Sequence, residues 1–173
     1  MDLGLTEKIV LVTGGSKGIG LACARTFITE GAKVVICLRD PNNIARAQAE
    51  LPGLYAAFAA DLRVAPDAEA MIARVEADVG PVDVLVNSAG AARRTPVREL
   101  TPALWRDAFD AKFFSYINVI DPMLKRMATR GRGVAVNVIG AGGRQASETH
   151  LGGGAANSAL VLASKTSAAR WSM

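Results

Sequence analysis

Short aliphatic runs alternate with helical repeats along the whole chain. Five of these runs are apolar on both faces and bounded by Gly, Pro, Asp or Asn, a pattern typical of parallel strands covered by helices on both sides. The predicted strands are Ile9–Thr13, Lys33–Leu38, Leu54–Ala59, Val82–Asn87 and Gly133–Ile139.

A segment with helical periodicity follows each predicted strand. Pro66 and Pro102 stand in the first turns of two of them, where proline is favoured. The predicted helices are Gly18–Glu30, Asn42–Glu50, Pro66–Val79, Thr101–Arg130 and Gly154–Trp171. Repeated βα units predict an α/β fold with a doubly wound parallel sheet in the strand order 3-2-1-4-5. Because the 173 residues contain no low-complexity linker, we expect a single domain, 1–173.

A glycine-rich turn joins the first strand to the first helix. Its glycines would let backbone N–H groups approach a pyrophosphate, while the helix N-terminus adds unpaired donors and a partial positive charge. We therefore expect this turn to bind a nucleotide through Gly14, Ser16, Lys17, Gly18, Ile19 and Gly20.

Composition narrows the class of protein. Half of the residues are hydrophobic and 21% are charged, which is typical of a globular domain. The net charge is +4, and the basic residues are scattered with few aromatics between them, so a nucleic-acid surface is not expected. No apolar run is long enough to span a membrane. The N-terminus lacks the basic segment followed by a hydrophobic stretch that is typical of a secretion signal, so secretion is not expected. Cys23 and Cys37 lie in apolar patterns and are expected to be buried, reduced thiols of a cytoplasmic protein, with no metal site.

Three motifs together resemble the short-chain dehydrogenase/reductase family. Besides the spacing Gly14-x3-Gly18-x-Gly20, Asp61-Leu62 follows the third strand, and Asn87-Ser88-Ala89-Gly90 is similar to the Asn-Asn-Ala-Gly of the family. The resemblance covers nearly the whole chain and implies a Rossmann-type dinucleotide-binding fold. It also implies that Asp61 and Leu62 lie at the adenine, that Asn87 stabilises the central sheet, and that Ala89 and Gly90 pass the adenine ribose. For Asp61, an N-cap of the following helix is the alternative.

The end of the second strand bears on the choice of cofactor. An NAD-specific site would place a carboxylate at the position of Leu38, but Arg39 follows instead, and Arg39 and Lys17 could flank a 2′-phosphate. Asp40 is the contrary signal, since an acid about 20 residues past the glycines can mark NAD(H). Because Asp40 precedes Pro41 and a helix, we interpret it as a cap. We expect NADP(H), with NAD(H) as the alternative.

The chain departs from the family at the catalytic positions. The resemblance implies a Ser after the fifth strand, a Tyr-x3-Lys pair on the next helix and an Asn on the preceding one. Alignment places Gly140 at the Ser, Gly153 at the Tyr, Asn157 at the Lys and Lys112 at the Asn. The interval of 13 residues from Gly140 to Gly153 equals the usual Ser-to-Tyr interval, so the alignment is self-consistent.

Lys112 and His150 remain as candidate proton donors. An ion-paired lysine and a surface histidine are the alternatives, and Tyr116, one helical turn after Lys112, is expected in the core. The sequence thus favours an NADP(H)-binding oxidoreductase that acts on a carbonyl or alcohol of a small molecule with non-standard catalytic groups. The other reading is an inactive cofactor-binding module, such as a sensor or an assembly subunit.

The family normally continues with two more strands and a pair of helices that covers the substrate. This sequence therefore looks short at its C-terminus, and its fifth strand is expected at an exposed sheet edge. We expect a longer natural chain, a homo-oligomer or another partner to cover that edge.

Overall fold

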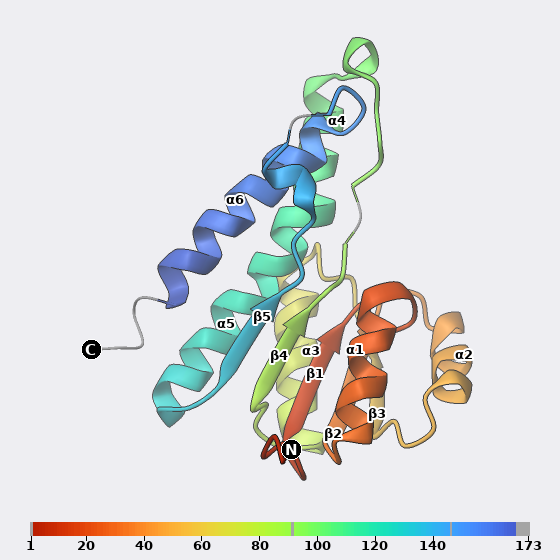
Figure 1. The fold of residues 1–173 in the computed structure, drawn as a ribbon, viewed down its shortest axis with the longest axis vertical. Coiled ribbons are helices and arrows are strands. Elements are labelled where there is room, and N and C mark those ends of the chain that lie inside the picture. The colour runs from red at the N-terminus through yellow and green to blue at the C-terminus, as the bar shows by residue number, and fades with distance from the viewer. Residues whose placement is uncertain (1, 91, 146, 169–173) are drawn as a thin grey trace.

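The fold is a parallel sheet with helices on both faces (Figure 1). The computed structural model describes residues 2–90, 92–145 and 147–168. The strand order is β3-β2-β1-β4-β5, as predicted, and every neighbouring pair is parallel. The strands are β1 (Ile9–Thr13), β2 (Lys33–Leu38), β3 (Ala56–Ala59), β4 (Val84–Asn87) and β5 (Val134–Asn137).

Strand β1 occupies the centre of the sheet and is buried along its whole length. Val10 pairs with Val34 of β2 on one side and with Val84 of β4 on the other. Leu11 belongs to the core cluster on one face of the sheet, while Val10 and Val12 belong to the cluster on the opposite face. This two-sided burial explains why the strands are aliphatic without polar alternation.

Two layers of helices supply these cores. Helices α1 (Gly18–Thr29) and α2 (Asn42–Glu50) pack on one face, and α3 (Ala65–Asp78) and α5 (Ser115–Arg130) pack on the other. Helix α6 (Leu151–Ala168) begins three residues before the predicted start at Gly154, because the N–H of Gly154 already bonds the carbonyl of His150 at 2.8 Å. Its predicted end at Trp171 lies outside the described residues.

The long predicted helix 101–130 is interrupted. Helix α4 (Pro102–Phe109) leads into a π-helical turn, η2 (Asp110–Phe114), before α5 begins. In the turn, the hydroxyl of Ser115 donates to the carbonyl of Ala111 at 3.0 Å. Single π-turns of this kind occur often at functional sites. The sequence pattern predicted one continuous helix here and did not reveal the turn.

Strand β5 forms one edge of the sheet and, among the described residues, pairs only with β4. Val134 and Val136 are 55% and 46% exposed there, which confirms the predicted exposed edge. A second copy or another partner on this edge stays a prediction. Of the two cysteines, Cys37 is buried as predicted, whereas Cys23 is only half-buried. None of the helices in the described ranges is long and apolar enough to cross a membrane.

Candidate cofactor groove and active site

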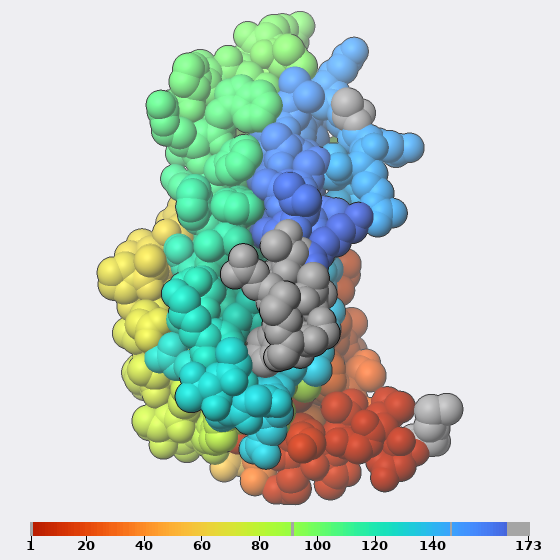
Figure 2. Space-filling view, turned by 90° about the vertical axis from the view of Figure 1, so that its left-hand side faces the viewer, coloured from red at the N-terminus to blue at the C-terminus, as the bar shows by residue number. Residues whose placement is uncertain are grey.

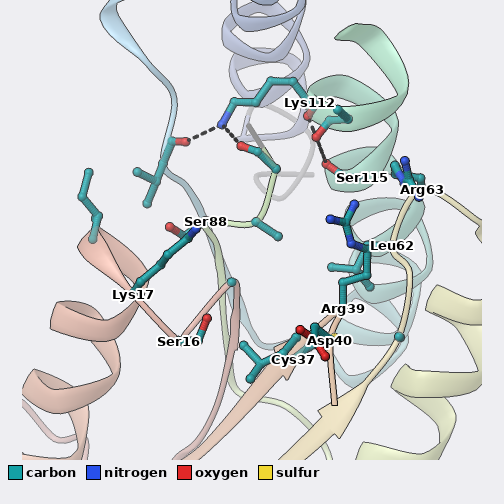
Figure 3. Close-up of a pocket in the computed structure, with 18 of the residues that line it drawn as sticks. Ser16, Lys17, Cys37, Arg39, Asp40, Leu62, Arg63, Ser88, Lys112 and Ser115 are labelled. Atoms are coloured by element: carbon teal, nitrogen blue, oxygen red, sulfur yellow. Dashed lines mark hydrogen bonds between the residues drawn. The ribbon is translucent and has the colours of Figure 1, made fainter. Parts of the chain in front are cut away.

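A groove of about 600 Å³ lies at the carboxyl ends of the strands (Figure 3). This is where open α/β sheets bind ligands, and the volume is in the usual range for small-molecule sites. The groove is lined by the β1–α1 turn, the ends of the other four strands and the η2 turn. Eight of the predicted cofactor residues line it: Gly14, Ser16, Lys17, Ile19, Arg39, Leu62, Ala89 and Gly90.

Two glycines of the turn leave no room for side chains at their positions. Gly14 has φ +72°, and a Cβ added to it would lie 2.8 Å from the Cα of Ala89. A Cβ on Gly20 would lie 2.4 Å from the carbonyl oxygen of Gly14. Gly18 has φ +56° and open space around it. Gly18 and Gly20 do not line the groove themselves. They shape the turn and leave a bare backbone of the kind that a pyrophosphate requires, so their predicted part in cofactor binding stays a prediction.

Asn87 also lies away from the groove, fully buried between three strands. Its Oδ1 accepts a hydrogen bond from Thr13 at 3.1 Å, and its Nδ2 donates to Asn137 at 3.2 Å. The Thr13 hydroxyl in turn accepts the backbone N–H groups of Ser88 and Ala89. Asn87 therefore joins β1, β4 and β5 and fixes the loop that lines the groove, which is the sheet-stabilising role that the resemblance implied rather than a direct contact with cofactor.

Asp61 pairs with a residue that the sequence analysis missed. Both of its carboxylate oxygens accept hydrogen bonds from Arg63, and that guanidinium is the main reason why the pKa of Asp61 is lowered. Leu62 and Arg63 line the groove, but Asp61 does not. The alternative role as an N-cap is wrong, because α3 follows Val64 without any side-chain cap. Arg63 lies just past β3, which pairs with β2, the strand that Arg39 follows. This position at the end of a strand could have identified Arg63 as a residue of the groove.

The acidic and the basic residue at the end of β2 differ in the partners that they bond. Asp40 accepts hydrogen bonds from the backbone N–H of Asn42 at 2.9 Å and from the side chain of Asn43 at 3.0 Å, which confirms that it caps the start of α2. Arg39 lines the groove and, among the described residues, forms no ion pair. Leu38 is buried beside it.

Lys112 closes the opposite end of the groove (Figure 3). Its ammonium donates to the hydroxyl of Tyr116 at 3.0 Å and, over longer distances, to the carbonyls of Gly90 at 3.4 Å and Val138 at 3.5 Å. Burial lowers the pKa of Lys112. Tyr116 is fully buried, as predicted, and its hydroxyl donates to the Val138 carbonyl at 2.7 Å.

The three positions aligned with Ser, Tyr and Lys lie close to one another. A Cβ on Gly140 would lie 3.0 Å from the amide nitrogen of Asn157, and a Cβ on Gly153 would lie 2.3 Å from Cε1 of His150. The imidazole of His150 thus fills the space of a side chain at position 153. His150 and Asn157 do not line the groove, and each has one buried polar atom, Nδ1 and Oδ1, without a hydrogen-bond partner within the described part of the chain.

We expect a coupling between positions 150 and 153. Gly153→Ala gains helix propensity but forces the ring of His150 aside, whereas in a His150→Ala background only a contact of 3.0 Å with the Cβ of Ala92 opposes the gain. In a double-mutant cycle followed by urea unfolding, Gly153→Ala should be more favourable in the His150→Ala background by about 1–2 kcal/mol. Equal effects in both backgrounds would show that the ring does not occupy this space.

The chain matches the short chain dehydrogenase family over residues 8–172. It belongs to that family. The D-threitol dehydrogenase of Mycolicibacterium smegmatis is 32% identical over 173 residues, which are 98% of this chain and 66% of that protein. The gluconate 5-dehydrogenase of Gluconobacter oxydans is 36% identical over 139 residues, which are 78% of this chain and 54% of that protein. The chain thus spans between about half and two thirds of the length of these relatives.

Solved structures show the same fold. A variant of actinorhodin polyketide ketoreductase, crystallised with NADPH, has a TM-score of 0.87 and 34% identity over 92% of this chain and 63% of that one. A short chain dehydrogenase from Bacillus anthracis has a TM-score of 0.89 and 27% identity over 96% of this chain and 69% of that one.

Proposed function

We propose that this protein is an NADP(H)-dependent oxidoreductase that acts on a carbonyl or alcohol group of a small molecule. The observation that carries the proposal is the continuous groove, which begins at the turn with the bare backbone of Gly14 and Gly20 and ends at the ammonium of Lys112. The turn would hold the pyrophosphate, and the nicotinamide, when bound, would supply the hydride. The ketoreductase crystallised with NADPH shares this fold and supports the proposal.

The preference for NADP(H) rests on the charges at the end of β2. The guanidinium of Arg39 has no carboxylate partner in the described ranges, and a planar guanidinium suits bidentate contact with a phosphate. Asp40 also lines the groove, but both of its carboxylate oxygens already accept hydrogen bonds from Asn42 and Asn43. Lys17 lines the groove from the glycine turn as a further cation.

NADPH should bind more tightly than NADH, by about 1–3 kcal/mol, which is the range for hydrogen bonds to charged groups. Calorimetric titration of both cofactors measures the difference, and Arg39→Ala should erase most of it while leaving NADH binding nearly unchanged. Arg46→Ala is the matched control, because this arginine lies on α2, pairs with Glu50 and does not line the groove. Equal affinities in the unaltered protein would mean that Arg39 does not contact the 2′-phosphate.

The alternative function is an inactive cofactor-binding module. It is favoured by one observation: Gly140, Gly153 and Asn157 bring neither a hydroxyl nor an amine to the positions where the resemblance implies catalytic groups. A panel of 4-nitrobenzaldehyde, cyclohexanone and ethyl acetoacetate, assayed with NADPH, separates the two functions. Turnover supports the oxidoreductase, whereas tight NADPH binding with no turnover of any probe supports the module.

An oxidoreductase of this kind needs a proton donor, and Lys112 and His150 are the two candidates from the sequence. Lys112 lines the groove. His150 does not line it, and its ring fills the space of a side chain at Gly153. We therefore place Lys112 first among the candidates and keep His150 second.

A further inference from the structure

The π-helical turn directs Lys112 across the end of the groove. Gly90, at the end of the β4 loop, has φ +96°, and a Cβ there would lie 2.2 Å from the carbonyl oxygen of Ala111 in the turn. Only a residue without a side chain allows this close approach. The Lys112 side chain passes beside Gly90 and reaches the Val138 carbonyl just after β5 (Figure 3).

The Lys112 ammonium lacks a counter-charge. No carboxylate of the described residues lies within 4.0 Å of it, and its three acceptors are neutral. Two of those contacts are long, at 3.4 and 3.5 Å, so a ligand oxygen could replace them at little cost. The other charged side chains on the groove come from the β1–α1 turn and from the ends of β2 and β3: Lys17, Arg39, Asp40 and Arg63.

We propose that Lys112 is the catalytic residue that protonates the substrate oxygen, and that Tyr116 is the positioning residue that holds its side chain. The inference rests on the proposed function. In carbonyl reduction a bound nicotinamide would supply the hydride to the carbonyl carbon. As the C=O π bond breaks, an N–H bond of Lys112 breaks and an O–H bond forms on the substrate. The neutral amine then takes a proton from water, and in alcohol oxidation the same amine accepts the hydroxyl proton.

The environment of Lys112 suits this role. Burial lowers the pKa of its ammonium, which makes it a better proton donor than an exposed lysine. The Tyr116 hydroxyl donates a hydrogen bond to the Val138 carbonyl and accepts one from the Lys112 ammonium. It therefore holds the ammonium in place, while its own hydrogen points away from the groove-facing amine. Burial also raises the pKa of Tyr116, which keeps that hydroxyl protonated.

The first test measures Lys112 directly, without turnover. Competitive acetylation of the whole protein with acetic anhydride, read by mass spectrometry across pH, reports the fraction of neutral amine at each lysine. Lys112 should titrate at a lower pH than a lysine in a short unstructured peptide, and NADPH should reduce its labelling. Tyr116→Phe should move its titration further down, because the charged form loses an acceptor. A peptide-like titration that ignores both NADPH and the Tyr116→Phe change would overturn the assignment.

The second test measures catalysis. Lys112→Met should lower kcat for the carbonyl probes by about 10²–10⁴-fold, the usual contribution of general acid catalysis. Lys112→Arg should lose nearly as much, because a guanidinium keeps the charge but does not release its proton. Lys125→Met is the matched control, since that lysine lies exposed on α5 in an ion pair with Asp121. Tyr116→Phe should change kcat rather than KM and shift the basic limb of the kcat profile to lower pH.

The two hypotheses fail in different ways. Turnover that survives both Lys112→Met and Lys112→Arg overturns the role of Lys112 and leaves the oxidoreductase standing. Tight NADPH binding without turnover of any probe overturns the oxidoreductase and the proton donor together. If turnover persists in the Lys112 variants and is lost in His150→Ala, the proton comes from the histidine.

Discussion

Gly20→Val should abolish NADPH binding. The first atom of the new side chain would lie 2.4 Å from the carbonyl oxygen of Gly14 and 3.3 Å from the Ser88 hydroxyl. The backbone cannot yield without moving the start of α1 away from Gly14, just after β1, and that movement would displace the N–H groups that would face a pyrophosphate. The free energy of unfolding should also fall, by about 1–3 kcal/mol for overpacking.

Fluorescence titration with NADPH and urea unfolding measure the two effects. Ala22→Val is the matched control, because it introduces the same β-branched side chain at an exposed position of the same helix. Gly14→Val gives an independent variant, since its Cβ would lie 2.8 Å from the backbone of Ala89 at a φ of +72°. A folded Gly20→Val protein that binds NADPH normally would remove the phosphate site from this turn.

The sheet could be predicted because its strands are encoded locally. Each strand is buried on both faces and ends at a turn residue, so composition and boundaries agree, and the order follows from right-handed crossovers. The strand ends were overestimated: Leu54 and Val82 are apolar but lie outside the paired residues of β3 and β4. The same apolar residue types occur in paired strands and in buried residues just outside them, so the sequence does not show where strand pairing begins.

The site was harder to predict where side chains bond to one another. Asn87 is the last residue of β4, where a ligand residue would be expected, yet it bonds inward to Thr13 and Asn137. Asp61 pairs with Arg63 two positions later, a contact that depends on the turn after β3. The motif spacing located these residues correctly, but the direction of each side chain is set by tertiary neighbours.

The departures at the catalytic positions of the family lie at and beside one end of the groove: Gly140 and Lys112 line it, whereas Gly153 and Asn157 do not. The cradle of the glycine turn and the free guanidinium of Arg39 remain at the cofactor end. At the other end the chain has Gly140 and Gly153, and the space at Gly153 is filled by His150 rather than left open. Under the proposed function, these residues would still hold a dinucleotide, and the proton would come from Lys112 on the η2 turn or from His150.

Gly90→Ala should be among the single changes that most lower the free energy of unfolding. Gly90 lies in the loop after β4 and packs closely against the η2 turn, which carries Lys112. An alanine would meet the Ala111 carbonyl at 2.2 Å and the Ser115 hydroxyl at 2.7 Å, at a φ of +96° that side chains rarely adopt. The strained backbone and the overpacking together should lower the free energy of unfolding by about 2–4 kcal/mol.

Gly4→Ala separates these two causes. Gly4 has a similar positive φ of +62° but nothing within 4 Å of an added Cβ, so its variant should lose only the backbone term. Urea unfolding should therefore show a clearly larger loss for Gly90→Ala than for Gly4→Ala. In the folded fraction of Gly90→Ala, the loop and the π-turn must move apart, and acetylation of Lys112 should approach that of a free lysine peptide. Equal losses in the two variants, with the Lys112 titration unchanged, would show that the approach of Gly90 to Ala111 does not hold the lysine in place.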